Sequence, residues 1–221
     1  MKKRRIIFGD YNTAAHGWTL SGWKLSAAEE KTNFKEKVSG DGSWDLSTAL
    51  TDGIPRYKDR TLTVRLERSD GNRQTRDAKI REMVNKLDGM RVDIYLPDHP
   101  FHHINGKLHV ERDYNDLVHA AVNVTAICGP WKLANIETAR TLTATAEVQT
   151  ALLVNDGRRA VVPTITVAEG GHVRLEYNGE TIELSAGTYQ WPEMLLRSGH
   201  HDLVYSGTGE VRVVYREAVL E

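Results

Sequence analysis

The stretch VSGDGSWDL, residues 38–46, followed by YKDRTLTVRL, residues 57–66, is the most informative part of the chain. Gly40 and Gly42 allow backbone angles with positive φ, and the carboxylate of Asp41 can accept hydrogen bonds from neighbouring backbone N–H groups. These residues predict a tight turn that positions Trp44. After Arg60 apolar and polar residues alternate, which predicts that the chain enters a half-buried β-strand.

The same alternation recurs through the first 130 residues and is interrupted by one helical pattern. Ile80, Met83, Val84 and Leu87 recur at helical spacing and form one apolar stripe. A helix is therefore expected over about 73–88. Strands that surround a single helix favour a split β-barrel or sandwich over a doubly wound parallel sheet. The predicted strands are 18–25, 34–38, 62–66, 90–96, 103–112 and 117–128.

A second domain is predicted after Gly129-Pro130, because proline cannot donate a hydrogen bond to a neighbouring strand. From there short apolar segments alternate with turn signals such as Asn178-Gly179, which is typical of a β-sandwich. A chain of 221 residues is long enough for two cores. We therefore expect a mainly β protein with domains 1–132 and 133–221. The strands predicted in the second domain are 142–154, 161–167, 172–177, 180–184, 188–191, 201–205 and 211–215.

The composition limits the classes of partner. The formal net charge is −1, with acidic and basic residues mixed along the chain, so no strong field attracts nucleic acid or an anionic membrane. The single cysteine, Cys128, has no partner for a disulfide within the chain, and we interpret it as a small buried hydrophobic residue. The basic residues 2–5 precede too short an apolar run for a signal peptide, and no segment has membrane-spanning length. We expect synthesis in a cytoplasm and a partner that is protein, including further copies of this chain.

Two patterns raise the possibility of a metal site. Histidines gather at positions 99, 102, 103 and 109, but no cysteine or matched carboxylate completes a coordination shell. Asp41, Ser43, Asp45 and Asp52 have the spacing of a calcium loop, yet Leu46 occupies the position that requires glycine. No metal and no cofactor are therefore predicted.

The chain shows none of the common catalytic motifs. No nucleophile elbow, phosphate-binding loop or dinucleotide fingerprint occurs, and pairing distant carboxylates into a hydrolase site has no support. We predict that the protein is not an enzyme. The aromatic residues Tyr177, Tyr189 and Trp191 could form a platform for sugars, which leaves a carbohydrate-binding module for host recognition as the alternative function. Trp191 precedes Pro192 and fits equally well as a plug at the end of the sandwich.

Taken in order, these features resemble the distal tail protein of siphophages, a phage tail and baseplate hub family. The match covers nearly the whole chain as an ordered succession of short motifs. These are residues 18–25, Gly40-Asp41-Gly42 with Asp45, Tyr57-x-x-Arg60, Leu87-Asp88-Gly89 before residues 93–98, residues 128–132, and Asn155-x-Gly157 before residues 163–167.

The resemblance implies a ring-forming N-terminal domain and a galectin-like C-terminal β-sandwich. In that family six copies form a hexameric hub between the tail tube and the tail tip. The implied partners are further copies of the chain, the tail tube protein, the tail-associated fibre or lysin protein and the receptor-binding protein. DNA only passes through the channel, and the protein is made in the host cytoplasm and resides at the virion tail tip. The chain is too short for an inserted carbohydrate-binding module.

The resemblance and the residue pattern together nominate structural or interface residues. Large aromatic side chains dominate both cores and interfaces, so the tryptophans are expected to anchor one or the other. Arg60 is expected to pair with Asp41 or Asp45, and the turn that contains them is expected at a strand connection near the ring interface, with no ligand. The candidate residues are Trp18, Trp23, Asp41, Trp44, Asp45, Tyr57 and Arg60.

Overall fold

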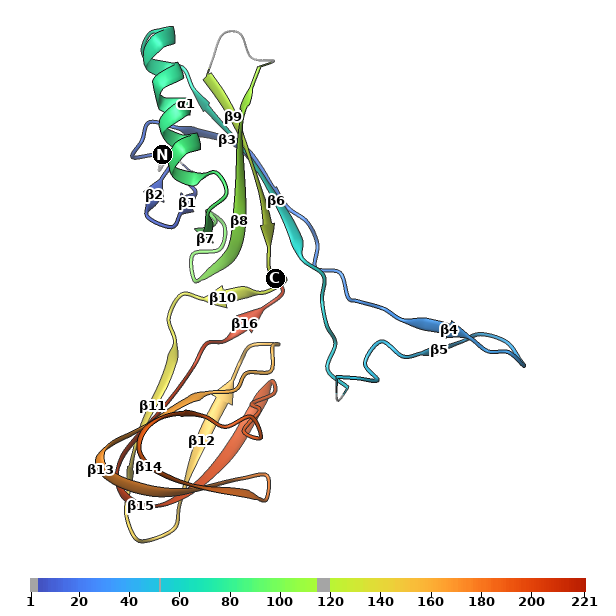
Figure 1. The fold of residues 1–221 in the computed structure, drawn as a ribbon, viewed down its shortest axis with the longest axis vertical. Coiled ribbons are helices and arrows are strands. Elements are labelled where there is room, and N and C mark those ends of the chain that lie inside the picture. The colour runs from blue at the N-terminus through green and yellow to red at the C-terminus, as the bar shows by residue number, and fades with distance from the viewer. Residues whose placement is uncertain (1–3, 52, 115–119) are drawn as a thin grey trace. The chain divides into compact units, whose positions relative to one another are not determined.

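The computed structural model describes residues 4–51, 53–114 and 120–221. The chain divides into two compact units, Met1–Lys132 (unit 1) and Leu133–Glu221 (unit 2), and each has its own hydrophobic core. Strands dominate both units, and the described residues contain one α-helix (Figure 1). The predicted mainly β fold class is confirmed. Within the described ranges, no helix is long and apolar enough to cross a membrane.

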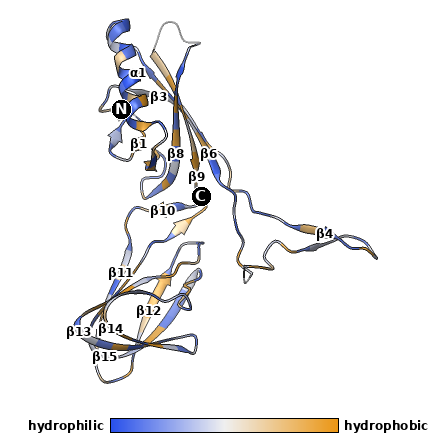
Figure 2. Ribbon diagram, viewed as in Figure 1, coloured by the Kyte–Doolittle hydropathy of each residue, from blue (hydrophilic) through white to orange (hydrophobic). Residues whose placement is uncertain are grey.

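Unit 1 is built on an antiparallel sheet with the strand order β2-β1-β7-β8-β9-β6-β3. Apolar residues alternate with polar ones along its strands (Figure 2), so one face carries the core. The predicted strand 117–128 begins three residues before the observed one, and those three residues lie outside the described ranges. The bounds are β1 Ile7–Phe8, β2 Tyr11–Asn12, β3 Thr19–Leu25, β6 Arg60–Arg68, β7 Arg91–Tyr95, β8 His102–Asp113 and β9 Ala120–Cys128.

The helix α1, Arg73–Leu87, covers the core face of this sheet through Ile80, Met83 and Leu87. Asn72 caps its first turn, because the side-chain oxygen accepts the backbone N–H of Thr75 at 2.9 Å. The helix lies within one residue of the range expected from the apolar stripe.

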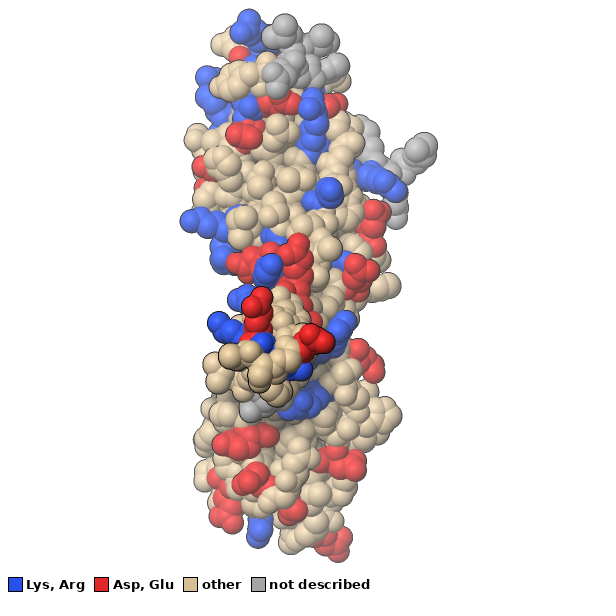
Figure 3. All heavy atoms as spheres, turned by 90° about the vertical axis from the view of Figure 1, so that its right-hand side faces the viewer, with Lys and Arg blue, Asp and Glu red and all other residues tan. Residues whose placement is uncertain are grey.

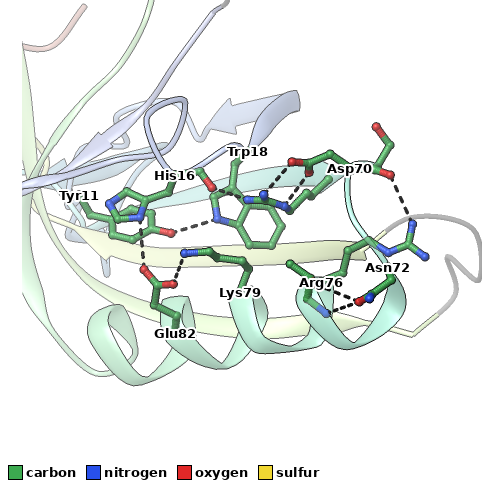
Figure 4. A network of polar contacts seen from close by, with 11 residues as sticks. Tyr11, His16, Trp18, Asp70, Asn72, Arg76, Lys79 and Glu82 are labelled. Carbon is green, nitrogen blue, oxygen red and sulfur yellow. Dashed lines mark hydrogen bonds and ion pairs between the residues drawn. The ribbon is translucent and has the colours of Figure 1, made fainter.

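A polar network fixes the segment between β2 and β3 against α1 and the end of β6 (Figure 4). Trp18 is buried, and its indole N–H donates to the hydroxyl of Tyr11 at 3.0 Å. The Tyr11 ring stacks on His16, whose Nδ1 lies 3.3 Å from a Glu82 carboxylate oxygen. The guanidinium of Arg68 donates to the carbonyl of His16 at 2.6 Å. Trp18 is thus an anchor of the core.

Unit 2 contains a five-stranded antiparallel sheet with the order β11-β15-β13-β14, in which β12 also pairs with β15. The first half of β15 pairs with β12 and the second half with β11. The short strands β10, which begins at the last residue of unit 1, and β16 pair with each other outside this five-stranded sheet. The bounds are β10 Lys132–Ala134, β11 Thr138–Ala144, β12 Gln149–Asn155, β13 Thr164–Tyr177, β14 Glu180–Gln190, β15 Gly199–Tyr215 and β16 Ala218–Val219.

The predicted division of unit 2 into many short strands is wrong in detail. Segments 161–167 and 172–177 belong to the single strand β13, and β14 and β15 each join two predicted strands in the same way. The predicted strand 142–154 is instead two strands. Glycines at these joints mark bends inside long strands. A Cβ atom on Gly209 would lie 2.8 Å from the Cα of Gly171, so two backbones pass in contact there.

One turn motif of unit 2 has the predicted conformation, and another has a clear structural role. Asn178 and Gly179 both have positive φ, 50° and 85°, as a two-residue hairpin requires. The fully buried amide of Asn155 donates to the carbonyls of Arg159 and Leu196 and accepts the backbone N–H of Gly157. The motif Asn155-x-Gly157 therefore organises a loop.

Candidate assembly interface

Residues 27–59 leave the sheet of unit 1 between β3 and β6 and form an extension that we call the arm (Figure 1). It contains β4, Phe34–Glu36, and β5, Ser43–Asp45, which pair with each other as a separate two-stranded sheet. At its root the N–H of Lys58 donates to the carbonyl of Glu29 at 2.8 Å. Tyr57 also lies there, with its ring edge-on to Trp131 at 5.2 Å between centroids.

The tip of the arm is the turn expected from the sequence. Gly40 and Gly42 have φ values of 118° and 82°, and they connect β4 to β5. The Asp45 carboxylate accepts the backbone N–H of Ser47 at 2.9 Å, and hydrogen bonding to Ser47 lowers its pKa. Asp45 thus stabilises the arm's backbone and stays ionised. Asp52, the last position of the calcium spacing, lies outside the described residues.

The arm exposes large apolar side chains. Phe34 and Trp44 are 59% and 61% exposed, and Leu50 is almost fully exposed. Among the described residues, none of the arm belongs to either hydrophobic core. A lone two-stranded hairpin is marginally stable in water, and exposed apolar groups rimmed by polar residues mark interaction sites. The arm is therefore the strongest candidate interface of the chain.

The two faces of the β4–β5 ribbon carry opposite charges. Residues directly across an antiparallel pair share a face, so Phe34 and Asp45 lie on one face, and Glu36 joins them two residues along. Lys35 and Trp44 are paired on the other face, where the ammonium of Lys37 lies 5.2 Å from the Trp44 ring centroid. Each face thus combines one exposed aromatic ring with two charges of one sign.

The sheet of unit 1 offers a second exposed surface, its outer face away from α1. Its cross-strand neighbours at one end are Arg91, Lys107 and Ile127, in that order across β7, β8 and β9. Ile127 is 50% exposed. Further along this face an open hollow of about 480 Å³, lined also by Arg65 and Glu111, lies next to Gly22, where a bulge interrupts the pairing of β3 with β6. Glycine at the bulge leaves this space free, because a Cβ atom there would contact nothing within 4 Å.

The outer face becomes acidic at its other end. The carboxylates of Asp113 and Glu67 lie 2.8 and 3.0 Å from the guanidinium of Arg65, and Glu111 lies two residues from Asp113 on β8. On the face visible in Figure 3, basic and acidic side chains are mixed.

The seven candidate residues lie in different environments. Trp18 is in the core, and Trp23 is partly buried against it, whereas Trp44, Asp41 and Asp45 are exposed on the arm. Arg60 is 4% exposed at the start of β6 and donates through Nε to the carbonyl of Ser26 at 2.7 Å. The Asp45 carboxylate accepts the backbone N–H of Ser47. The pairing of Arg60 with Asp41 or Asp45 stays a prediction.

Sequence reasoning missed the outer face of the sheet. Alternation along a strand shows only that one face is polar, and the cross-strand order that groups Arg91 with Lys107 depends on register. Gly22 within the strand pattern was the one signal for the hollow, because an isolated glycine in a strand often marks a bulge.

The histidines that raised the metal hypothesis are held by other partners. Nε2 of His99 lies 3.1 Å from the ammonium of Lys132, and His109 lies 3.0 Å from the Asp88 carboxylate. No group of three or more potential metal ligands occurs within the described ranges. Burial, together with nearby cations, lowers the pKa of His99. Burial also raises the pKa of Cys128 to about 11, so that thiol stays protonated.

Two of the three aromatic residues expected to form a sugar platform in unit 2 are buried, and the third is partly buried. Tyr177 and Trp191 are 2% and 5% exposed and belong to the core, and Tyr189 packs against it. The hydroxyl of Tyr177 donates to the carbonyl of Leu195. Tyr177 and Trp191 therefore belong to the core of unit 2 and do not form an exposed stacking platform.

No family model matches this sequence, and no curated protein matches it. Among solved structures, the chain is similar to the crystal structure of the SPP1 Dit (gp 19.1) protein, described as a paradigm of the hub adsorption apparatus in phages that infect Gram-positive bacteria. The TM-score is 0.71 at 13% identity, over 97% of this chain and 98% of that chain.

A second similar structure is the phage P2 baseplate in its activated conformation with Ca, with a TM-score of 0.50 at 8% identity over 98% of each chain. At such identities the likeness concerns the fold. The resemblance to siphophage distal tail proteins predicted from the sequence is confirmed at that level.

Proposed function

We propose that this chain is a structural virion protein, the distal tail hub subunit of a long-tailed phage or prophage. The observation that carries the proposal is the likeness of fold to a phage hub protein over 97% of the chain. In the proposed assembly six copies close into a ring that joins the tail tube to the tail tip and the receptor-binding apparatus. The work of such a protein is geometric and needs no active site.

The arm supports the assembly part of this proposal. A ring arises when one surface of a subunit binds a different surface of the next and the rotation closes. The arm is exposed, carries aromatic side chains of the kind that dominate interfaces, and shares no core with its own chain. A neighbouring copy would bury exposed aromatic surface of the arm and stabilise the ribbon.

The remaining partners follow from the proposed position in the tail. The tail tube protein would bind one side of the ring, and the fibre or lysin protein and the receptor-binding protein would bind the tip side. DNA would pass through the channel during ejection without specific recognition, which fits a formal net charge of −1. The site of action would be the virion tail tip, after synthesis in the host cytoplasm.

Multi-angle light scattering on the purified chain over a range of concentrations tests the proposal. The expected result is a species of about six times the 24.9 kDa chain mass that grows with concentration. The double variant Phe34→Ala/Trp44→Ala should shift the equilibrium to monomer, while Leu152→Ala, at a half-exposed position of unit 2, should not. A chain that stays monomeric at every concentration and fails to join tail components contradicts the proposal.

A further inference from the structure

We propose that the arm of one copy docks on the outer sheet face of a second copy through the ribbon face that carries Phe34. The Phe34 ring would lie over Ile127, with Arg91, Lys107 and Lys24 around it. The inference rests on the proposed function and specifies which two surfaces meet in the ring. We call Lys24, Arg91, Lys107 and Ile127 the cationic patch.

The cationic patch is a surface that a partner would stabilise. Arg91 and Lys107 are directly opposed on neighbouring strands, and like charges in that position repel. Arg91 bonds the side-chain oxygen of Asn105 at 3.1 Å, and that amide donates to Asp93 at 2.8 Å. Within the described part of the chain, no ion pair involves Arg91 or Lys107. An anionic surface laid over the pair would relieve the repulsion.

The apolar side chain at the centre of the cationic patch limits the chemical class of partner that can bind there. Ile127 lies directly beside Lys107 on β9 and is half exposed, and Lys24 lies on β3, opposite Thr63 of β6. A matching surface needs an apolar group between carboxylates. Nucleic acid offers phosphates without an apolar centre at its backbone, so it fits this surface less well than a protein face does.

The Phe34 face of the arm has that composition. Phe34 is 59% exposed, and Glu36 and Asp45 share its face of the ribbon. Both carboxylates are exposed, and hydrogen bonding to Ser47 lowers the pKa of Asp45. The opposite face carries Lys35 and Lys37 around Trp44 and would be repelled by the patch. Charge therefore sets which side of the ribbon faces the neighbour.

The two surfaces are different from each other and belong to the same chain. Each copy can offer its arm to one neighbour and its sheet to the other, which is the heterologous contact that a closed ring uses. Because part of the contact is electrostatic, assembly should weaken as ionic strength rises.

A charge-exchange cycle tests the proposal by light scattering. Glu36→Lys and Lys107→Glu should each weaken self-association by about tenfold or more, because each brings like charges together. The double variant Glu36→Lys/Lys107→Glu should recover assembly, since it restores opposite charges with their positions exchanged. Lys35→Glu is the matched control, because it changes the neighbouring residue on the opposite face, and assembly should persist.

Cross-linking provides a second readout that does not depend on folding differences. A mixture of the variants Phe34→Cys and Ile127→Cys, treated with a short bismaleimide, should give covalent dimers. A mixture of Trp44→Cys with Ile127→Cys should give few. The native Cys128 is 1% exposed with a pKa of about 11, so it should not compete.

The outcomes separate this inference from the proposed function. If the wild-type chain forms rings but the charge variants assemble equally well and Trp44→Cys cross-links as readily as Phe34→Cys, the docking surface is wrong and the hub function stands. If Lys107→Glu abolishes binding of a short DNA duplex and leaves assembly intact, the patch serves nucleic acid. A strictly monomeric wild-type chain overturns both.

Discussion

Replacing Gly106 with alanine is expected to destabilise unit 1. Gly106 is directly opposite Cys128 in the pairing of β8 with β9. A Cβ atom at position 106 would lie 2.6 Å from the Cys128 sulfur and 3.3 Å from both the Ile127 carbonyl oxygen and the Ile94 methyl carbon. Unstrained heavy-atom contacts are about 3.5–4.0 Å, so the sulfur would have to move by about 1 Å.

The expected change in the free energy of unfolding is the difference between two opposing contributions. Inserting a methyl group into a packed core costs about 1–3 kcal/mol. Alanine restricts the unfolded chain more than glycine does, which contributes about 0.4–1 kcal/mol in the stabilising direction. The matched control is Gly129→Ala, because a Cβ there would meet nothing within 4 Å. The two variants should therefore differ in free energy of unfolding by about 1–3 kcal/mol, with Gly106→Ala the less stable.

Urea unfolding followed by tryptophan fluorescence measures this difference, since four of the five tryptophans lie in unit 1. The cause is checked by adding Cys128→Ala, which removes the sulfur that the new methyl group contacts. The double variant should be at least about 1 kcal/mol more stable than the sum of the single changes predicts. If Gly106→Ala is as stable as Gly129→Ala, or if removing the sulfur gives no rescue, the reasoning is refuted.

Three further predictions concern single side chains. Cys128 should resist thiol reagents in the native state and react once urea unfolds unit 1, because burial raises its pKa to about 11; rapid native labelling would contradict this. The lowered pKa of His99 means that the unfolded chain binds the proton more readily. Stability should therefore fall as the pH drops below the ordinary pKa of about 6.5, and His99→Gln should flatten that pH dependence of the urea midpoint where His200→Gln should not. Asn155→Ala should cost unit 2 about 2–3 kcal/mol in thermal or urea unfolding, because it leaves buried backbone groups without partners; a change below about 0.5 kcal/mol would count against that role.

Local sequence signals predicted the elements that depend on neighbouring residues. The apolar stripe of α1 defines a helix through contacts within four residues. The glycines at 40 and 42 define the tip of the arm, and Asn178-Gly179 defines a hairpin, because positive φ is a property of the residue itself. These features were predictable because their physical causes are local.

Glycine was a misleading turn signal where it allows contact between residues far apart in the sequence. Gly209 lies against Gly171, 38 positions earlier in the chain, and allows two strands to bend together. From sequence, such glycines were indistinguishable from turns, and each long strand of unit 2 was divided in two. The environment of the tryptophans was equally hidden, because Trp18 and Trp44 both follow strand-like patterns while one is buried and the other is 61% exposed.

The mainly β class, the single helix, the tight turn at 40–42 and an ordered set of motifs that resembles the phage hub family were all predictable from the residues alone. The tertiary structure decided that the turn at 40–42 ends an arm outside the core, that Tyr177 and Trp191 are buried, and that Arg91, Lys107 and Ile127 form one surface. The physical reason is that a residue's backbone preference acts within a few positions, whereas burial and surface charge depend on the strand register that joins distant segments.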